Sequence, residues 1–435
     1  MSHPSKALLA PSPLPPPAIA PGIAAAPAQA LKERPASRLS IALSICREMT
    51  ALEDEWRAFE QVADCTVFQS FDWLSRWCRH VGTDVRAAVV VGRGANDALL
   101  FVLPLAVKRG LVRRLAFLGD GLCDYNAPLL APDFCARLDA ADVRALWQDI
   151  CALLQRDAHL QYDVVELTKM PETVGAQANP LIDLPVSLNA SGAHLTGLSG
   201  SWDEFYGAKR SSSTRRRDRT KLKRLSEYGE IRCVEPAMAD DIRQTLEILV
   251  AQKSKQFGRM GVKNLFARPG HRDFFFDLAT DPRARHLVHI SQLDVGPTAA
   301  AVNLGLTFRG TYYHVLASYD DGEVARFGPG AAHLRELLQH AIAKGLSRFD
   351  FTIGDERYKL EWSDTSIRLY DHMAAATLRG LPLVLMSAAF RRLKRLIKQN
   401  PILWRSFSGL RTMAAALRGR HAGDAQDAEQ TSSGK

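Results

Sequence analysis

The chain has 435 residues, of which 46% are hydrophobic and 24% are charged, and its formal net charge is +9. This composition is typical of a folded globular protein and excludes a fibrous or wholly disordered one. The longest apolar run, over residues 381–390, is too short for a membrane-spanning helix, which needs about 18 apolar residues. The positive charge favours an anionic partner, which can be nucleic acid, a phosphorylated cofactor or anionic lipid.

The first half of the chain begins with a tail, residues 1–36, that is rich in proline and alanine. Proline removes backbone donors, so we expect this tail to be disordered and not to be a signal peptide. The following domain is predicted over residues 37–195. Its expected elements are a strand at 39–46, helices at 51–62 and 71–81, strands at 85–91, 98–107 and 111–118, a helix at 133–155 and a strand at 162–167.

The second half repeats this order over residues 196–380. Its expected elements are a strand at 231–234, helices at 240–256 and 271–279, strands at 286–293, 298–308 and 311–318, a helix at 330–344, and strands at 348–351 and 366–377. Arg-Gly pairs at 109–110 and 309–310 mark the same hairpin turn in both halves. Hairpin strands followed by a helix and another strand indicate an α/β fold with a mixed sheet in each half.

A basic run occupies residues 209–224, where nine lysines or arginines accompany a single acid. Aromatic residues are missing from this run, so stacking platforms for single-stranded nucleic acid are absent and specific nucleic-acid binding is not expected. The remaining interpretations are a solvated helix at the start of the second domain and a helix that contacts the phosphates of a donor.

The segment from Arg326 to Ala331 predicts an anion-binding turn before a helix. It contains Arg326, Phe327, Gly328, Gly330 and Ala331. Unpaired amides and the positive end of the helix dipole suit a phosphate there, and an arginine can hold the same phosphate. An ordinary turn is the alternative interpretation.

An acidic loop follows the strand that carries Asp350. Loops at strand ends are common active sites in α/β proteins. We expect Asp350 to be the general base, with Asp355 and Glu356 as alternatives. Tyr358 is a candidate proton donor. Lys359 either contacts a donor phosphate or pairs with a neighbouring glutamate one helical turn away. Surface ion pairs are the alternative interpretation for each single residue.

The C-terminal part predicts a basic amphipathic helix over residues 381–420 and a second disordered tail over 421–435. This helix either packs on the domain with a solvated basic face or contacts anionic membrane. The seven cysteines are scattered and form no CxxC pair. We therefore expect no disulfide framework, no zinc or other metal site and a cytoplasmic location, with peripheral contact at the inner face of the membrane as an open alternative.

Residues 68–74 (FQSFDWL) and 349–362 resemble the CelD/BcsL family, which contains the BioF2-like acetyltransferase domain of the GNAT superfamily. Residues 214–225 are similar to the basic helix of that family, and Arg326–Gly330 corresponds to its loop-helix turn. The resemblance covers residues 40–380. It implies two tandem GNAT-like domains and acyl transfer from acyl-CoA, such as acetyl-CoA, with no permanently bound cofactor. One departure is Ala325, which stands where the superfamily's pyrophosphate loop begins with glutamine or arginine.

The resemblance implies that the acceptor is an amine or hydroxyl of a sugar or envelope precursor, because family members often accompany polysaccharide synthesis genes. Two alternatives stay open. A Fem-like transferase would use aminoacyl-tRNA to modify peptidoglycan precursors, which the basic run at 209–224 also suits. A non-catalytic protein would use the same fold to bind components of a polysaccharide synthesis system, for instance in cellulose biosynthesis.

Overall fold

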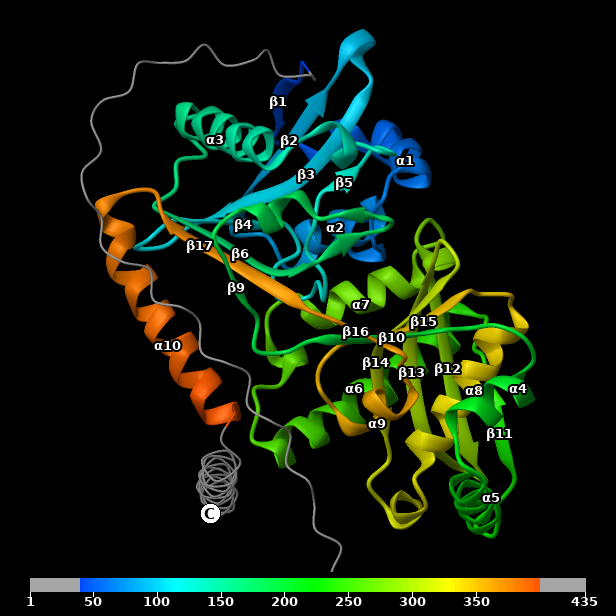
Figure 1. Ribbon diagram of the computed structural model, residues 1–435. Coiled ribbons are helices and arrows are strands. Elements are labelled where there is room, and N and C mark those ends of the chain that lie inside the picture. Colours follow the sequence, from blue (N-terminus) through cyan, green and yellow to red (C-terminus); the bar gives the residue numbers. More distant parts are fainter. Residues whose placement is uncertain (1–39, 400–435) are drawn as a thin grey trace, which may run out of the picture. The chain divides into compact units, whose positions relative to one another are not determined.

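The computed structural model of the chain describes residues 40–399, and the predicted tails and residues 400–420 lie outside this range. The described residues form two mixed sheets, each flanked by helices (Figure 1). The first sheet has the order β1 (Ala42–Cys46), β2 (Val85–Arg93), β3 (Leu99–Lys108), β4 (Arg114–Phe117), β6 (Val164–Pro171), β17 (Leu369–Ala375) and β9 (Val186–Leu188), with β5 (Leu129–Leu130) paired to β3.

The second sheet has the order β11 (Ile231–Val234), β12 (Val288–Val295), β13 (Thr298–Phe308), β14 (Thr311–Tyr319), β15 (Arg348–Ile353), β10 (Ala193–Gly197) and β16 (Thr365–Ile367). A small hairpin joins β7 (Thr173–Val174) to β8 (Gln177–Ala178). The helices are α1 (Glu53–Val62), α2 (Phe71–His80), α3 (Ala140–Arg156), α4 (Trp202–Lys209), α5 (Ser212–Ser226), α6 (Ala239–Met260), α7 (His271–Thr280), α8 (Pro329–Ala343), α9 (Arg357–Trp362) and α10 (Leu381–Gln399). The predicted mixed α/β fold is confirmed.

The two sheets share one topology. In each, four strands are antiparallel and the fourth pairs in parallel with the fifth, β4 with β6 and β14 with β15. The next strand in the first sheet is β17, which comes from the second half and pairs with β6, whereas the next strand in the second sheet is β10, which spans the boundary of the halves and pairs with β15. The sequence predicts one strand at 366–377 in the second half, whereas the structure divides this segment into β16, which pairs with β10 in the second sheet, and β17, which joins the first sheet. Strands β17 and β10 thus cover the otherwise open edge of the fifth strand in each sheet.

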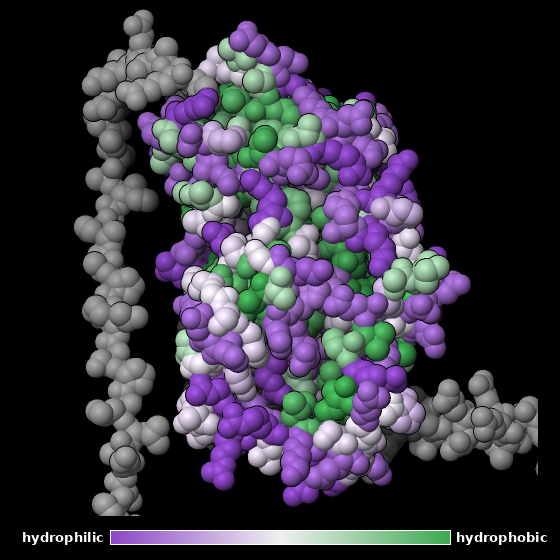
Figure 2. Space-filling model, turned by 90° about the vertical axis from the view of Figure 1, so that its right-hand side faces the viewer, coloured by the Kyte–Doolittle hydropathy of each residue, from purple (hydrophilic) through white to green (hydrophobic). Residues whose placement is uncertain are grey.

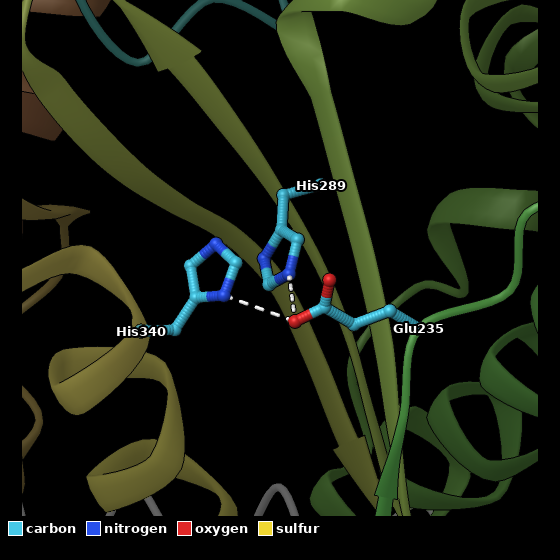
Figure 3. A group of neighbouring side chains, drawn as sticks. All are labelled: Glu235, His289 and His340. Atoms are coloured by element: carbon cyan, nitrogen blue, oxygen red, sulfur yellow. Dashed lines mark ion pairs between the residues drawn. The ribbon is translucent and has the colours of Figure 1, made fainter. Parts of the chain in front are cut away.

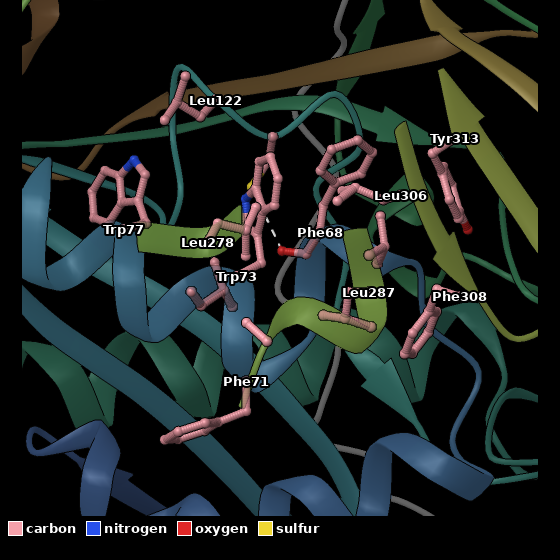
Figure 4. Packing of buried hydrophobic residues seen from close by; sticks show 14 of the residues in the cluster. Phe68, Phe71, Trp73, Trp77, Leu122, Leu278, Leu287, Leu306, Phe308 and Tyr313 are labelled. Atoms are coloured by element: carbon pink, nitrogen blue, oxygen red, sulfur yellow. Dashed lines mark hydrogen bonds between the residues drawn. The ribbon is translucent and has the colours of Figure 1, made fainter. Parts of the chain in front are cut away.

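A single hydrophobic cluster joins the two halves (Figure 4). The fully buried Trp73 of α2 packs edge-to-face on Phe274 of α7, with ring centroids 4.8 Å apart. Phe68, which precedes α2, packs in the same way on Tyr313 of β14 at 5.9 Å. Ser70 caps α2 by accepting from the Trp73 amide. Residues 68–74 therefore form part of the contact between the halves.

A buried arginine reinforces this contact. Arg76 on α2 pairs with Asp72 at 2.9 Å in its own helix and with Asp281, after α7, at 2.5 Å. Arg57 on α1 binds the Asp72 carboxylate through two further hydrogen bonds. Breaking a buried ion pair on one side leaves an uncompensated charge, so this network favours one arrangement of α2 against α7.

Helix α10 contains the described part of the predicted basic helix. It contacts β17, and its apolar residues Leu385 and Met386 are exposed. Among residues 40–399, every helix is too short or too polar to cross a membrane. The face in Figure 2 carries hydrophilic side chains over most of its area, with smaller hydrophobic areas between them.

Candidate functional site

The candidate site lies where two parallel strands of the second sheet separate. Strands β14 and β15 pair only from Thr311–Arg348 to Tyr313–Asp350, although β14 continues to Tyr319. The chain leaves β15 through Thr352, whose φ is +60°. A β-branched residue pays a steric cost in this left-handed region, and such strain is concentrated at functional sites. The strands thus separate next to Asp350.

Asp350 is buried and receives two hydrogen bonds on the same oxygen. The Tyr125 hydroxyl and the Thr352 amide both donate to its Oδ1 at 2.7 Å. Burial raises the pKa of Asp350 to about 7, although both hydrogen bonds oppose the rise. A carboxylate with a pKa near neutrality is suited to accept a proton at physiological pH.

Tyr125 comes from the first half of the chain and is positioned by the motif at residues 68–74. Gln69 in that motif donates to the Tyr125 carbonyl oxygen at 2.8 Å. Its side-chain oxygen accepts from the amide and hydroxyl of Thr66, at 3.1 and 2.8 Å. The first half thus supplies a hydrogen-bond donor to the candidate base in the second half.

His314 on β14 follows the last residue paired with β15. Its neighbour Asn303 satisfies all its contacts when the amide oxygen accepts from the Gly305 amide and the Tyr312 hydroxyl. The Asn303 nitrogen then donates to His314 Nε2 at 3.0 Å and to the Leu316 carbonyl at 3.2 Å. His314 therefore carries its proton on Nδ1, and this buried N–H has no hydrogen-bond partner within residues 40–399. A buried donor without a partner costs free energy, so a bound ligand is its natural acceptor.

The acidic loop after β15 carries the other candidate catalytic residues. Lys359 is buried; its Nζ donates to the Ile353 carbonyl at 2.7 Å and pairs with Glu356 at 3.2 Å. The predicted pairing with a neighbouring glutamate is confirmed for Glu356. Tyr358 is partly exposed, and burial of its hydroxyl raises its pKa. Asp355 is more exposed than Asp350, and it accepts from the Gly192 amide at 3.2 Å.

The predicted anion-binding turn lies at the start of α8. Gly328 has a φ of +71° directly before Pro329, the first residue of that helix, and glycine adopts this conformation without steric cost. Arg326 donates to the Tyr228 hydroxyl at 2.6 Å and lies over the ring of Phe327. Gly330 and Ala331 form the first turn of the helix.

The basic run forms α5, which lies against this turn. A Cβ placed on Gly328 would lie 3.9 Å from Lys221 Nζ of α5. The helix is anchored by the buried Leu225 and by Asp218, which accepts from the Tyr206 hydroxyl at 2.8 Å. Its other basic side chains are largely exposed, namely Arg216, Arg217, Arg219, Lys223 and Arg224. Two features that the sequence analysis treated separately thus form one cationic surface, which we call the basic turn (Lys221, Arg326 and Gly328–Ala331).

Two hollows lie away from these residues. One, about 30 Å³ in volume, is apolar and lies between α3 and the first sheet, beside Phe101 and Trp147. The other, about 320 Å³, is polar and lies on α6 and α7, beside Glu247 and Arg272. None of the predicted site residues lines either hollow, and neither contains the convergent polar groups of the candidate site. We therefore place the site by its chemistry.

Sequence reasoning missed several residues of functional interest. Tyr125 lies in the loop between β4 and β5 in the first half, His314 lies on β14 in the second half, and neither lies in a motif. The described residues also include one group that can hold a metal ion, Glu235, His289 and His340, although no metal site is predicted. A short sequence motif could not have revealed these three residues, because they lie far apart in the sequence.

Comparisons with known proteins match part of the chain to a known domain. Residues 212–360 match the model of an acetyltransferase (GNAT) domain. This segment, less than half of the chain, begins with α5 and contains the basic turn, His314, Asp350 and Lys359. The finer assignment to the CelD/BcsL family stays a prediction, and no curated protein matches the chain.

Among solved structures, the chain is similar to FemX, with 10% identity and a TM-score of 0.52, over 77% of this chain and 98% of that one. A conserved protein of unknown function from Bacteroides thetaiotaomicron has 15% identity and a TM-score of 0.48, over 77% and 99% of the two chains. A tandem GNAT protein from the clavulanic acid biosynthesis pathway has 10% identity and a TM-score of 0.44, over 78% and 99%. At this level of identity, the likeness to FemX shows a shared fold and nothing about substrates.

Proposed function

We propose that the chain is an acyltransferase that moves an acyl group from acyl-CoA to an amine or hydroxyl of a sugar or envelope precursor. The observation that carries this proposal is that the basic turn and the separating strands occur together in the segment that matches the GNAT domain model. The basic turn would bind the phosphates of the acyl-CoA donor, and the gap between the separating strands would hold its acyl group.

The donor would bind through its phosphates at the basic turn. Lys221 and Arg326 contribute positive charge, and the first turn of α8 contributes amides and the positive end of the helix dipole. Ala325 departs from the usual first residue of the superfamily's loop. Lys221, which comes from a different helix, supplies a cation near the turn despite this departure.

The chemistry would take place beside Asp350. The acceptor attacks the thioester carbonyl directly, and Asp350 removes the proton of the attacking amine or hydroxyl. The Nδ1–H of His314 donates to the carbonyl oxygen as negative charge develops on it. Tyr358 then returns a proton to the leaving thiol, while Lys359 holds the acidic loop through Glu356 and Ile353.

A second candidate function follows from the exposed bases of α5. A helix with this many cations can follow a nucleic-acid backbone, so aminoacyl-tRNA is a donor to test alongside acyl-CoA. The third alternative, a non-catalytic binding protein, would retain ligand binding without turnover.

The proposal predicts that acetyl-CoA raises the melting temperature of the purified full-length chain. A ligand that binds only the folded state stabilises it by about 2.7 kcal/mol at 100 times its dissociation constant. Longer acyl-CoAs and charged tRNA are the other two arms of the same thermal-shift experiment, and uncharged tRNA is the control. If charged tRNA stabilises the chain and none of the acyl-CoAs does, the Fem-like alternative replaces the proposal. Binding of acetyl-CoA without transfer to any amine or hydroxyl acceptor would favour the non-catalytic one.

Arg326→Ala should weaken donor binding by about 10- to 150-fold, because a hydrogen bond to a charged group contributes about 1.5–3 kcal/mol. Gly328→Val should weaken it as well, since valine disfavours a φ of +71°. The measurement is the dissociation constant of acetyl-CoA by calorimetry. Arg283→Ala, which removes an exposed arginine outside the basic turn, is the matched control. If Arg326→Ala binds acetyl-CoA with unchanged affinity, the phosphates bind on α5 instead. Lys221→Ala should then lower the affinity for acetyl-CoA.

A further inference from the structure

Three side chains from separate elements meet on the side of the second sheet that α8 covers (Figure 3). Glu235 follows β11, His289 lies on β12 and His340 lies in the last turn of α8. Glu235 Oε1 is 2.9 Å from His340 Nδ1 and 3.4 Å from His289 Nε2. The two imidazole rings are stacked, with their centroids 4.0 Å apart and their planes 19° from parallel, so one ring must rotate before both nitrogens can point at the same ion. The two nitrogens and the carboxylate oxygen lie within 4.8 Å of one another.

Hydrogen bonds behind His289 determine which of its nitrogens carries the proton. The backbone groups of Gly305 and Leu316 orient the amide of Asn303, and the Tyr312 hydroxyl must then donate its only proton to Asn303 Oδ1 at 2.7 Å. His289 Nδ1 lies 2.8 Å from that same hydroxyl. Since the hydroxyl proton is already used, the imidazole is the donor, and the neutral ring bears its proton on Nδ1.

The other nitrogen of His289 is left without a donor. Its Nε2 is fully buried and has no hydrogen-bond partner within residues 40–399. A lone pair there faces the Glu235 carboxylate, which is itself an acceptor, and two such groups repel each other unless a cation lies between them. We infer that Glu235, His289 and His340 bind a divalent transition-metal ion of the zinc class.

The ligand set and its spacing both suit such an ion. Zinc binds imidazole nitrogen and carboxylate oxygen at about 2.0–2.2 Å, so neighbouring ligand atoms lie roughly 3.3 Å apart in a tetrahedron. The two distances to Glu235 Oε1, 2.9 and 3.4 Å, bracket this value, and the two nitrogens lie within 4.8 Å of each other. Two imidazoles and one carboxylate also disfavour the alkaline-earth ions, which prefer oxygen ligands. The Tyr312 hydroxyl behind His289 provides the outer hydrogen bond that orients a histidine ligand.

The site is open on one side. The side chain of Glu235 is 52% exposed, whereas those of His340 and His289 are 19% and 12% exposed. An ion can therefore enter from solvent past Glu235 and keep a water molecule as its fourth ligand. From His289 a chain of hydrogen bonds runs through Tyr312 and Asn303 to His314, so an ion here would hold His314 in the Nδ1–H form described above.

The test is metal binding by the full-length chain. After chelation and removal of the chelator, the chain should bind one equivalent of Co²⁺ with the visible absorption of a tetrahedral site and without a thiolate-to-cobalt band. Zn²⁺ should displace the Co²⁺ and raise the melting temperature. His340→Gln and Glu235→Gln should each weaken the binding by more than about tenfold, since even the loss of an outer-shell partner costs that much. His286→Gln, which removes an exposed histidine nearby, is the matched control.

Each outcome bears on the inference. In His340→Gln and Glu235→Gln, glutamine retains most of the size of the side chain that it replaces. The melting temperatures of these variants without metal show whether they fold. The inference is overturned if the unaltered chain binds no stoichiometric Co²⁺, or if His340→Gln and Glu235→Gln bind as well as His286→Gln. It is also overturned if the thiolate band appears, because a cysteine such as Cys233 would then be the ligand. The result is independent of acyl transfer, so failure of one proposal leaves the other standing.

Discussion

Asp350→Asn should lower turnover roughly 10²- to 10⁴-fold and leave the affinity for acetyl-CoA unchanged, because asparagine keeps the shape of the side chain but cannot accept a proton. The loss should fall on the single-turnover rate, since Asp350 is not one of the residues of the basic turn that we propose for donor phosphates. Asp203→Asn, which alters an exposed carboxylate on α4, is the matched control. If Asp350→Asn is fully active, the base is Glu356, Asp355 or a bound water molecule.

The same carboxylate determines the pH dependence that we expect. Because burial raises the pKa of Asp350 to about 7, the side chain is largely protonated at pH 6 and the single-turnover rate should rise with pH through about 7. Tyr125→Phe removes a hydrogen bond that favours the charged form, so the midpoint of this rise should move to higher pH. A purely structural role for Tyr125 would lower the rate without moving the midpoint.

Trp73→Ala should lower the free energy of unfolding by about 3–5 kcal/mol, the range observed when a large buried aromatic side chain is truncated. Trp73 is fully buried against Phe274 in the cluster that joins the halves, so the cavity would lie where the first and second halves meet. Urea denaturation should show both halves unfolding together at a lower midpoint. Leu111→Ala, at a fully exposed leucine, is the control and should change the free energy by less than about 0.5 kcal/mol.

Two separate transitions in that experiment, with only the first affected by Trp73→Ala, would contradict the shared core. The buried pairs of Arg76 with Asp72 and Asp281 offer a second variant, Arg76→Met. This change removes the cation that Asp281 pairs with and leaves Asp72 with Arg57 alone, so it should also destabilise both halves.

The sequence by itself determined many of the local elements, although it did not predict α4 and α9, and the helix predicted at 133–155 begins at Ala140. Strands β12, β13 and β14 and helices α7 and α8 follow from apolar periodicity and from the glycines at their ends, which are properties of neighbouring residues. The turn at Gly328 and the position of Asp350 at the end of a strand were accessible for the same reason. The pairing of Lys359 with Glu356 followed from the spacing of one helical turn.

Only the tertiary structure decided which elements meet. The strand Leu369–Ala375 joins the first sheet because a sheet edge can pair with any strand of suitable register. A local sequence pattern does not specify which of two sheet edges a strand will pair with. In the same way, Tyr125 reaches Asp350 across the two halves, Lys221 approaches Gly328 from another helix, and Glu235, His289 and His340 converge from three elements. Such contacts arise from the packing of distant segments, because side chains that are remote in the sequence become neighbours only when the two halves pack around their common hydrophobic core.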